Sequence, residues 1–87
     1  MRKWYYVYAL YNSFFKKFYI GSTTNLKRRL KEHKKAKYPH RNRNFKLIFI
    51  EIFPNKQDAL KREKYLKTTK GRLTLRAMLK NTLKFLK

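Results

Sequence analysis

The chain contains no cysteine, which excludes a disulfide framework and a metal site built on thiolates. Glycine and proline number two each, too few for a collagen-like, proline-rich or flexible-linker sequence. No apolar run approaches the roughly 20 residues that a membrane span needs. These absences leave a small folded domain without disulfides, linkers or a transmembrane helix as the expectation.

Acidic residues are also scarce. The 87 residues hold 25 Lys and Arg but only 4 Asp and Glu, so the formal net charge is +21. A surface of this kind repels itself and attracts polyanions. Because 43% of the residues are hydrophobic and 17% aromatic, the chain has more core material than a disordered basic tail. We therefore expect one domain over residues 1–87 with an acidic partner.

The N-terminus bears on the expected location. Met1, Arg2 and Lys3 resemble the start of a signal peptide, but the tyrosines that follow interrupt its apolar segment. We therefore expect a cytoplasmic protein. Nucleic acid is the abundant polyanion there, and we expect no membrane partner.

The apolar patterning predicts a mixed chain with the order β-β-α-β-α-α. Aromatic and β-branched runs indicate the strands, and apolar residues at helical spacing indicate the helices. The most apolar strand carries hydrophobic residues on both faces, which is typical of a central strand or of one covered by helices on both sides. The expected ranges are strands 4–10, 18–21 and 47–53, helices 25–35 and 56–68, and a final amphipathic helix through residues 75–86.

Local signals mark the ends of these elements. Ser22, Thr23 and Thr24 offer an N-cap for the first helix, and Asn55 has cap-like chemistry before the second. Gly21 marks a place where the backbone needs room or a positive φ. Gly71 punctuates the chain before the last helix.

The first predicted helix directs two functional side chains toward its apolar side. At about 100° per residue, His33 falls on the stripe formed by Leu26 and Leu30, and Arg29 lies on its shoulder. Each has an ordinary interpretation, since Arg29 fits a surface cation with a buried stem and His33 a hydrogen-bonded boundary residue. Both alternatives remain open on the spacing alone.

The second predicted helix places an acid among apolar residues. Glu63 lies on the stripe that contains Ala59 and Leu66, and a buried carboxylate is costly unless it is paired or bound to a metal. An ion pair with a neighbouring cation is the structural interpretation. The functional interpretation is a single carboxylate ligand for Mg²⁺, which commonly takes one or two carboxylates, substrate phosphate and water.

Tyrosine is abundant, with seven residues. Tyr8 and Tyr19 lie on the two predicted hairpin strands and could meet across it, as ordinary cross-strand pairs do. Beside an arginine and a metal, a tyrosine hydroxyl could act as a general base on water, because cations favour the phenolate. That help is necessary, since the ordinary pKa of tyrosine is about 10.

Three segments carry a resemblance to a known family. Tyr6-Val7-Tyr8 followed by Tyr19-Ile20-Gly21 resembles the paired motif of the GIY-YIG endonucleases, with Tyr6 where glycine is usual. Residues 19–33 are close to that family's second strand and first helix, and residues 59–67 to its metal-binding helix. The ending is similar to that of the small stand-alone bacterial members, the YhbQ-like group. The resemblance covers nearly the whole chain.

The resemblance implies an α+β fold, a small three-stranded antiparallel sheet flanked by three helices. It also implies hydrolysis of phosphodiester bonds in DNA with Mg²⁺, or alternatively Mn²⁺. Carried over by position, Tyr8 is the general base or water-orienting hydroxyl and Tyr19 its partner. Arg29 stabilises the transition state, His33 supports Tyr8 or the scissile phosphate, and Glu63 holds the metal.

Further residues are expected to contact DNA. The family often places an asparagine near the end of the domain, and only one stands in the C-terminal region of this chain. Basic side chains beside the motif, in the loop 37–44 and before the last helix add to this set. The candidates are Arg28, His40, Arg41, Arg43, Arg72 and Asn81.

Two other functions remain as alternatives. A non-catalytic module that binds DNA or RNA explains the charge equally well, but it has no use for Glu63 on an apolar stripe. A cationic membrane-surface protein would favour a single amphipathic helix over a β-rich core. No heptad seam predicts a dimer, so the sequence leaves a monomer or a higher state open and does not specify the preferred DNA structure.

Overall fold

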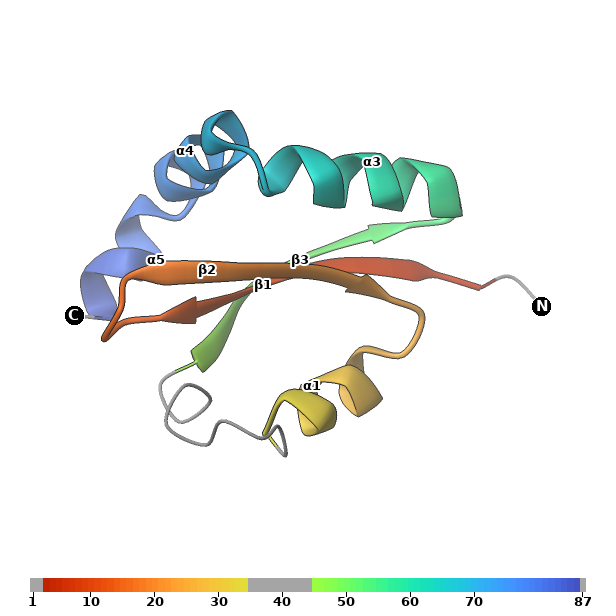
Figure 1. Ribbon diagram of the computed structural model, residues 1–87, viewed down its shortest axis with the longest axis horizontal. Coiled ribbons are helices and arrows are strands. Elements are labelled where there is room, and N and C mark those ends of the chain that lie inside the picture. The colour runs from red at the N-terminus through yellow and green to blue at the C-terminus, as the bar shows by residue number, and fades with distance from the viewer. Residues whose placement is uncertain (1–2, 35–44, 87) are drawn as a thin grey trace.

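The computed structural model describes residues 3–34 and 45–86. Three strands form one antiparallel sheet with the order β2-β1-β3, which confirms the predicted fold class (Figure 1). The last predicted helix is divided into two. The elements are β1 (Tyr5–Asn12), β2 (Lys17–Thr23), α1 (Leu26–Lys34), β3 (Phe45–Phe53), α3 (Lys56–Leu66), α4 (Thr69–Met78) and α5 (Lys80–Phe85).

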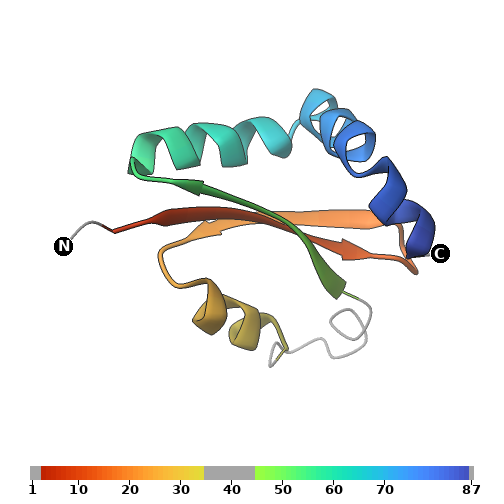
Figure 2. The ribbon, with the colours of Figure 1, turned by 180° about the vertical axis from the view of Figure 1, so that it is seen from behind.

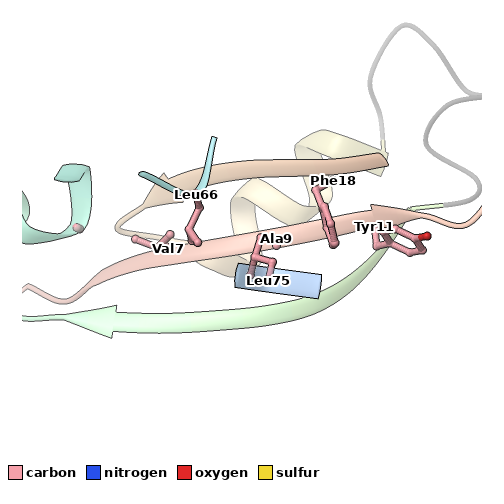
Figure 3. Close-up of a cluster of buried hydrophobic side chains, with 7 residues drawn as sticks. Val7, Ala9, Tyr11, Phe18, Leu66 and Leu75 are labelled. Atoms are coloured by element: carbon pink, nitrogen blue, oxygen red, sulfur yellow. The ribbon is translucent and has the colours of Figure 1, made fainter. Parts of the chain in front are cut away.

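The helices lie on both sides of the sheet. Helices α3 and α4 cover one face and α1 lies on the other, as both ribbon views show (Figures 1 and 2). Side chains alternate along β1, so Val7, Ala9 and Tyr11 point to the α3 side. They pack there with Leu66 and Leu75, which are fully buried (Figure 3). Tyr8 and Leu10 point to the opposite face, where α1 lies.

The most apolar strand is expected to be central or covered by helices on both sides, and β3 does not take the central place. β1 occupies the centre, and β3 is an edge strand paired only with β1 among the described strands. One face of β3 packs on the core through Phe49 and Phe53. On its other face, Ile50 and Ile52 remain 43% and 54% exposed. Apolar residues on both faces therefore do not require a central place.

Side-chain caps define where the turn and the helices begin. The Oδ1 atom of Asn12 accepts hydrogen bonds from the backbone N–H groups of Phe14 and Phe15 and so closes the β1–β2 turn. The cap of α1 is Asn25, whose Oδ1 accepts from Arg28 N at 3.0 Å, and not one of residues 22–24. The predicted cap of α3 is confirmed, because Asn55 accepts from residues 57 and 58.

Gly71 serves close packing and does not separate two elements. It lies inside the first turn of α4. A Cβ atom placed there would lie 2.0 Å from the carbonyl oxygen of Tyr65 and 2.6 Å from the Cα atom of Leu66. Only glycine lets α4 approach the end of α3 this closely. The contact fixes the angle at which α4 follows the helix that carries Glu63.

Candidate active site

The ring of Tyr8 crosses β2 over a glycine. The register pairs Tyr8 with Gly21, and a Cβ atom at Gly21 would lie 2.5 Å from the Tyr8 hydroxyl oxygen. The φ of Gly21 is not positive, so the residue supplies room and not an unusual backbone conformation. Because β2 is an edge strand, the missing side chain lets the Tyr8 hydroxyl reach the rim of the sheet.

Helix α1 brings Arg29 and His33 to this hydroxyl. Their four-residue spacing puts both side chains on one side of the helix. Arg29 Nε donates to the Tyr8 oxygen at 3.3 Å, and the same oxygen lies 3.1 Å from His33 Nε2. Arginine can only donate, so the tyrosine oxygen accepts from Arg29. In the tautomer that leaves Nε2 of His33 unprotonated, the tyrosine hydroxyl donates to that nitrogen.

The charges of the cluster support this assignment. Burial lowers the pKa of His33 below its ordinary value of 6.5 and the charge of Arg29 lowers it further, whereas Glu32 opposes the shift. His33 is therefore neutral at pH 7. The hydrogen bond to Tyr8 and its electrostatic effect raise the pKa of Arg29, which remains a cation throughout. A fixed cation and a neutral base thus share one tyrosine oxygen.

Glu63 lies on the other face of the sheet, where α3 packs. Its side chain is 17% exposed, and its carboxylate accepts from Ser22 Oγ at 2.5 Å and from Lys67 Nζ at 2.8 Å. Burial alone raises the pKa of Glu63. Hydrogen bonds from Lys67 and Ser22, with the charges of Lys67 and Arg29, outweigh burial and lower this pKa below its ordinary value. The carboxylate is therefore ionised at neutral pH.

The two halves of the site meet at the edge strand. Gly21 and Ser22 are neighbours on β2, so they face opposite sides of the sheet. Gly21 lies under the Tyr8 ring, and Ser22 holds Glu63. The charge of Arg29 acts on the Glu63 carboxylate, which links the α1 side to the α3 side. The arrangement is one polar site that straddles β2.

Tyr19 lies on the same face as Tyr8 but outside this hydrogen-bonded cluster. It pairs with Leu10, two residues along β2 from the Tyr8–Gly21 pair. Its side chain is 43% exposed, and its ring packs edge to face against Phe45 with 4.5 Å between centroids. Tyr19 is therefore partly exposed on the same face as Tyr8, with its ring against Phe45.

The remaining candidates are spread over the surface. Arg28 is exposed on α1, where its backbone N–H bonds the Asn25 cap. Arg72 lines a cavity together with Lys67 and Arg76. Asn81 is exposed on α5. His40, Arg41 and Arg43 lie outside the described residues.

Sequence reasoning missed two residues that hold Glu63. Lys67 follows it by four positions, a spacing that pairs glutamate with lysine on a helix surface and could have indicated the contact. Ser22 stands 41 positions before Glu63. Strand alternation after Gly21 sends Ser22 to the face opposite Tyr8, but only the packing of α3 on β2 shows what it meets there.

Replacing Gly21 by alanine is expected to destabilise the fold by about 1–3 kcal/mol, because the added Cβ overpacks against the Tyr8 ring. Displacement of the ring also breaks the contacts of Tyr8 with Arg29 and His33. Chemical denaturation measures the loss. Tyr8→Phe with Gly21→Ala controls the cause, since it keeps the ring clash but removes the hydroxyl. An unchanged denaturation midpoint in Gly21→Ala would contradict the close approach.

The described residues contain neither a cluster of metal-binding side chains nor a membrane-spanning helix. Over residues 3–34 and 45–86, no three His, Cys, Asp or Glu side chains are grouped to hold a metal ion. Mg²⁺ sites commonly combine one or two carboxylates with substrate and water, so a single carboxylate such as Glu63 is compatible with such a site. None of the described helices is both long and apolar enough to cross a membrane.

Comparisons with known proteins identify the family of the chain. The model of the GIY-YIG catalytic domain matches residues 4–77. A UPF0213 protein of Clostridium perfringens (strain 13 / Type A) is 42% identical over 52 residues, and the alignment spans 56% of each chain. A UPF0213 protein of Limosilactobacillus reuteri (strain DSM 20016) is 44% identical over 71 residues, 72% of this chain and 70% of the relative. No solved structure matches. Because the domain model covers most of the sequence, the chain belongs to the GIY-YIG family.

Proposed function

We propose that the protein is a divalent-metal-dependent endonuclease that hydrolyses phosphodiester bonds in DNA. The observation that carries the proposal is the Tyr8 hydroxyl, held between the Arg29 cation and the neutral His33 at the rim of the sheet. The family match supports a nuclease, and the net charge of +21 supports a polyanionic substrate.

The Tyr8 hydroxyl activates or orients the attacking water. As the water oxygen attacks phosphorus and the bond from phosphorus to the 3′ oxygen breaks, Tyr8 takes a proton from the water and passes its own proton to His33 Nε2. The Arg29 cation contacts the same Tyr8 oxygen. Tyr8 is 2% exposed, so water reaches its oxygen beside Arg29, whose side chain is half exposed. The Tyr19 hydroxyl is the second group that positions this water.

Arg29 also faces the charge that develops on the scissile phosphate. Its Nε is engaged by Tyr8, and half of its side chain is open to solvent. A fixed guanidinium directed at the phosphate oxygens stabilises the transition state more than the ground state. Further phosphate contacts hold the DNA. They come from Arg28, Arg72, Asn81 and the basic residues His40, Arg41 and Arg43.

Glu63 is suited to a single-carboxylate metal site. Its carboxylate is ionised, faces the β2 edge and already accepts two hydrogen bonds, and hard oxygen ligands suit Mg²⁺ or Mn²⁺. When bound, the metal supplies Lewis-acid polarisation of the phosphate and stabilisation of the leaving 3′ oxygen. Glu63 is the residue that would hold the ion, and Ser22 fixes its carboxylate by a hydrogen bond.

Supercoiled plasmid and branched DNA provide the test of this function. Incubation with Mg²⁺ or Mn²⁺ is expected to yield nicked or linear products that a chelator prevents. Binding is followed in parallel by the mobility of the DNA. Retention of DNA without cleavage on any substrate or with either metal would contradict the nuclease and favour the non-catalytic binding module.

The pH dependence of cleavage reports on His33. Its pKa is lowered below 6.5, so acidification protonates the ring only below that pH. Protonated Nε2 no longer accepts the tyrosine proton, and the cleavage rate falls. Stability falls in the same window, because the unfolded state binds the proton more readily than the folded state. Rates measured between pH 5 and 8 check this expectation.

The variant His33→Gln separates chemistry from stability. Glutamine keeps an acceptor for the Tyr8 hydroxyl but does not titrate. The acid side of its rate profile is expected to be flat down to the range where Glu63 protonates. A profile with the same acid decrease as the original protein would show that another group limits the rate.

A further inference from the structure

The tip of the β1–β2 hairpin carries an aromatic cavity from which the proposed mechanism uses only Tyr19. The cavity has a volume of about 140 Å³ and is lined by Asn12, Phe15, Lys17, Tyr19 and Phe45. Three of these five residues are aromatic. Phe15 is 53% exposed and Tyr19 is 43% exposed. Flat aromatic surfaces are thus presented to solvent beside a lysine.

A second, strongly basic cavity adjoins the first. It measures about 540 Å³, and no acid lines it. Lys17 and Tyr19 of β2 line both cavities, so the two lie next to each other at this strand. Lys67 lines the basic cavity and also bonds Glu63, which joins the cavity to the candidate active site. The cations that line it among the described residues are Lys16, Lys17, Lys67, Arg72 and Arg76.

The hairpin tip is fixed before any ligand arrives. The buried Asn12 side chain accepts from two backbone N–H groups of the turn. Lys16 has a left-handed φ of 55°, and its carbonyl accepts from Arg76 Nη2 at 3.1 Å. The guanidinium of Arg76 also stacks 5.0 Å from the centroid of the Phe18 ring. Binding at this tip therefore requires little ordering of the protein.

We propose that the aromatic cavity binds an unpaired base of a nucleic-acid strand whose phosphates lie along the basic cavity. Aromatic side chains beside cations are the combination that single strands require, since bases stack on the rings and phosphates meet the charges. A paired base is stacked inside its duplex and does not present its face. The proposal deepens the proposed function by naming a substrate that has unpaired nucleotides next to the cleaved bond.

Binding is measured without divalent metal, so that cleavage plays no part. The probes are labelled oligothymidylate, an abasic oligonucleotide of the same length and a duplex of the same length, followed by fluorescence anisotropy. Oligothymidylate is expected to bind more tightly than the abasic strand, which has the same phosphates. Phe15→Ala is expected to weaken oligothymidylate binding on the order of tenfold. The affinity of Phe15→Ala for the abasic strand and for the duplex is expected to change by less than about twofold.

Two further variants sharpen this test. Phe15→Trp keeps a stacking surface and is expected to retain the affinity for oligothymidylate. Phe85→Ala is the matched control, because this phenylalanine is 88% exposed on α5 and lines neither cavity. It should leave all three affinities unchanged.

Equal affinity for the oligothymidylate and the abasic strand would overturn the proposal, as would an equal loss for all probes in Phe15→Ala. Tighter binding to duplex than to oligothymidylate would overturn it as well. Base-dependent binding by a protein that cleaves no DNA would refute the nuclease alone. Cleavage with base-independent binding would refute only the aromatic cavity.

Discussion

Replacing Arg29 by alanine is expected to lower the single-turnover rate of DNA cleavage by about 10²–10³-fold while DNA affinity falls only slightly. The guanidinium donates to the Tyr8 oxygen and, in the proposed mechanism, faces the scissile phosphate. Removing a fixed donor directed at developing charge costs this much in other enzymes. Its loss also removes the cation that contacts the Tyr8 oxygen. Quenched-flow or gel-based single-turnover assays at saturating protein measure the rate.

Arg28→Ala is the matched control for this variant. The two arginines are neighbours on the same helix and carry the same charge, but Arg28 is turned by about 100° and its side chain is exposed. Its removal deletes one phosphate contact at most, so affinity weakens and the rate at saturation stays within about threefold. Equal loss of rate in both variants would attribute the effect of Arg29 to charge alone.

A double-mutant cycle tests whether Arg29 acts through Tyr8. Tyr8→Phe removes the hydroxyl but keeps the ring over Gly21. If Arg29 and Tyr8 form one unit, the fold loss of rate in the double variant is well below the product of the fold losses in the two single variants. Additive losses would mean that Arg29 serves only the phosphate and that its 3.3 Å contact with Tyr8 has no part in catalysis.

The α1 half of the site could be predicted because its spacing is local. Helical periodicity alone puts Arg29 and His33 on one side of α1, next to the apolar stripe. The structure confirms this orientation, since both side chains contact Tyr8. That they contact Tyr8 is a tertiary fact, because 25 positions separate Tyr8 from His33. The family resemblance supplied this grouping, and periodicity did not.

The place of β3 shows why hydrophobicity did not give the strand order. Residues 47–53 are apolar on both faces, yet β1 is central. Strand order depends on the edge of the sheet to which the chain comes back after α1. The composition of one strand does not determine that edge. The sequence pattern also does not show that the last predicted helix is divided at Leu79. Leu75, Leu79 and Leu83 keep helical spacing, although α4 ends at Met78 and α5 begins at Lys80.

The sequence predicts an unusual environment for Glu63 but not the partner of its carboxylate. One of four acids on the stripe of Ala59 and Leu66 indicated a special environment, and its side chain is indeed 17% exposed. The sequence left an ion pair and a metal ligand as alternatives. The contact with Lys67 shows that the ion pair exists, and the metal role stays a prediction. A carboxylate offers more acceptor positions than Lys67 and Ser22 occupy, so both roles are compatible.

Replacing Glu63 by glutamine is expected to abolish the stimulation of cleavage by Mg²⁺. The amide keeps the size of the side chain and an acceptor for Ser22 but loses the negative charge that attracts the ion. Metal stabilisation is worth several kcal/mol, so the rate at saturating Mg²⁺ falls by about 10³-fold or more. Calorimetric titration with Mn²⁺ in the presence of an uncleaved DNA analogue is expected to show weakened metal binding.

Glu51→Gln is the matched control for Glu63→Gln, because Glu51 also faces the α3 side and forms an ion pair, with Arg62. It is expected to keep both the Mg²⁺ response and the Mn²⁺ affinity. The stability of Glu63→Gln should fall little, since the partner Lys67 is half exposed and such pairs contribute at most about 1 kcal/mol. Because the pKa of Glu63 is lowered, its stabilising contribution is present above pH 4.5 and lost as pH falls through the folded pKa. Unchanged Mn²⁺ affinity in Glu63→Gln would assign the carboxylate to the ion pair with Lys67 and place the metal elsewhere.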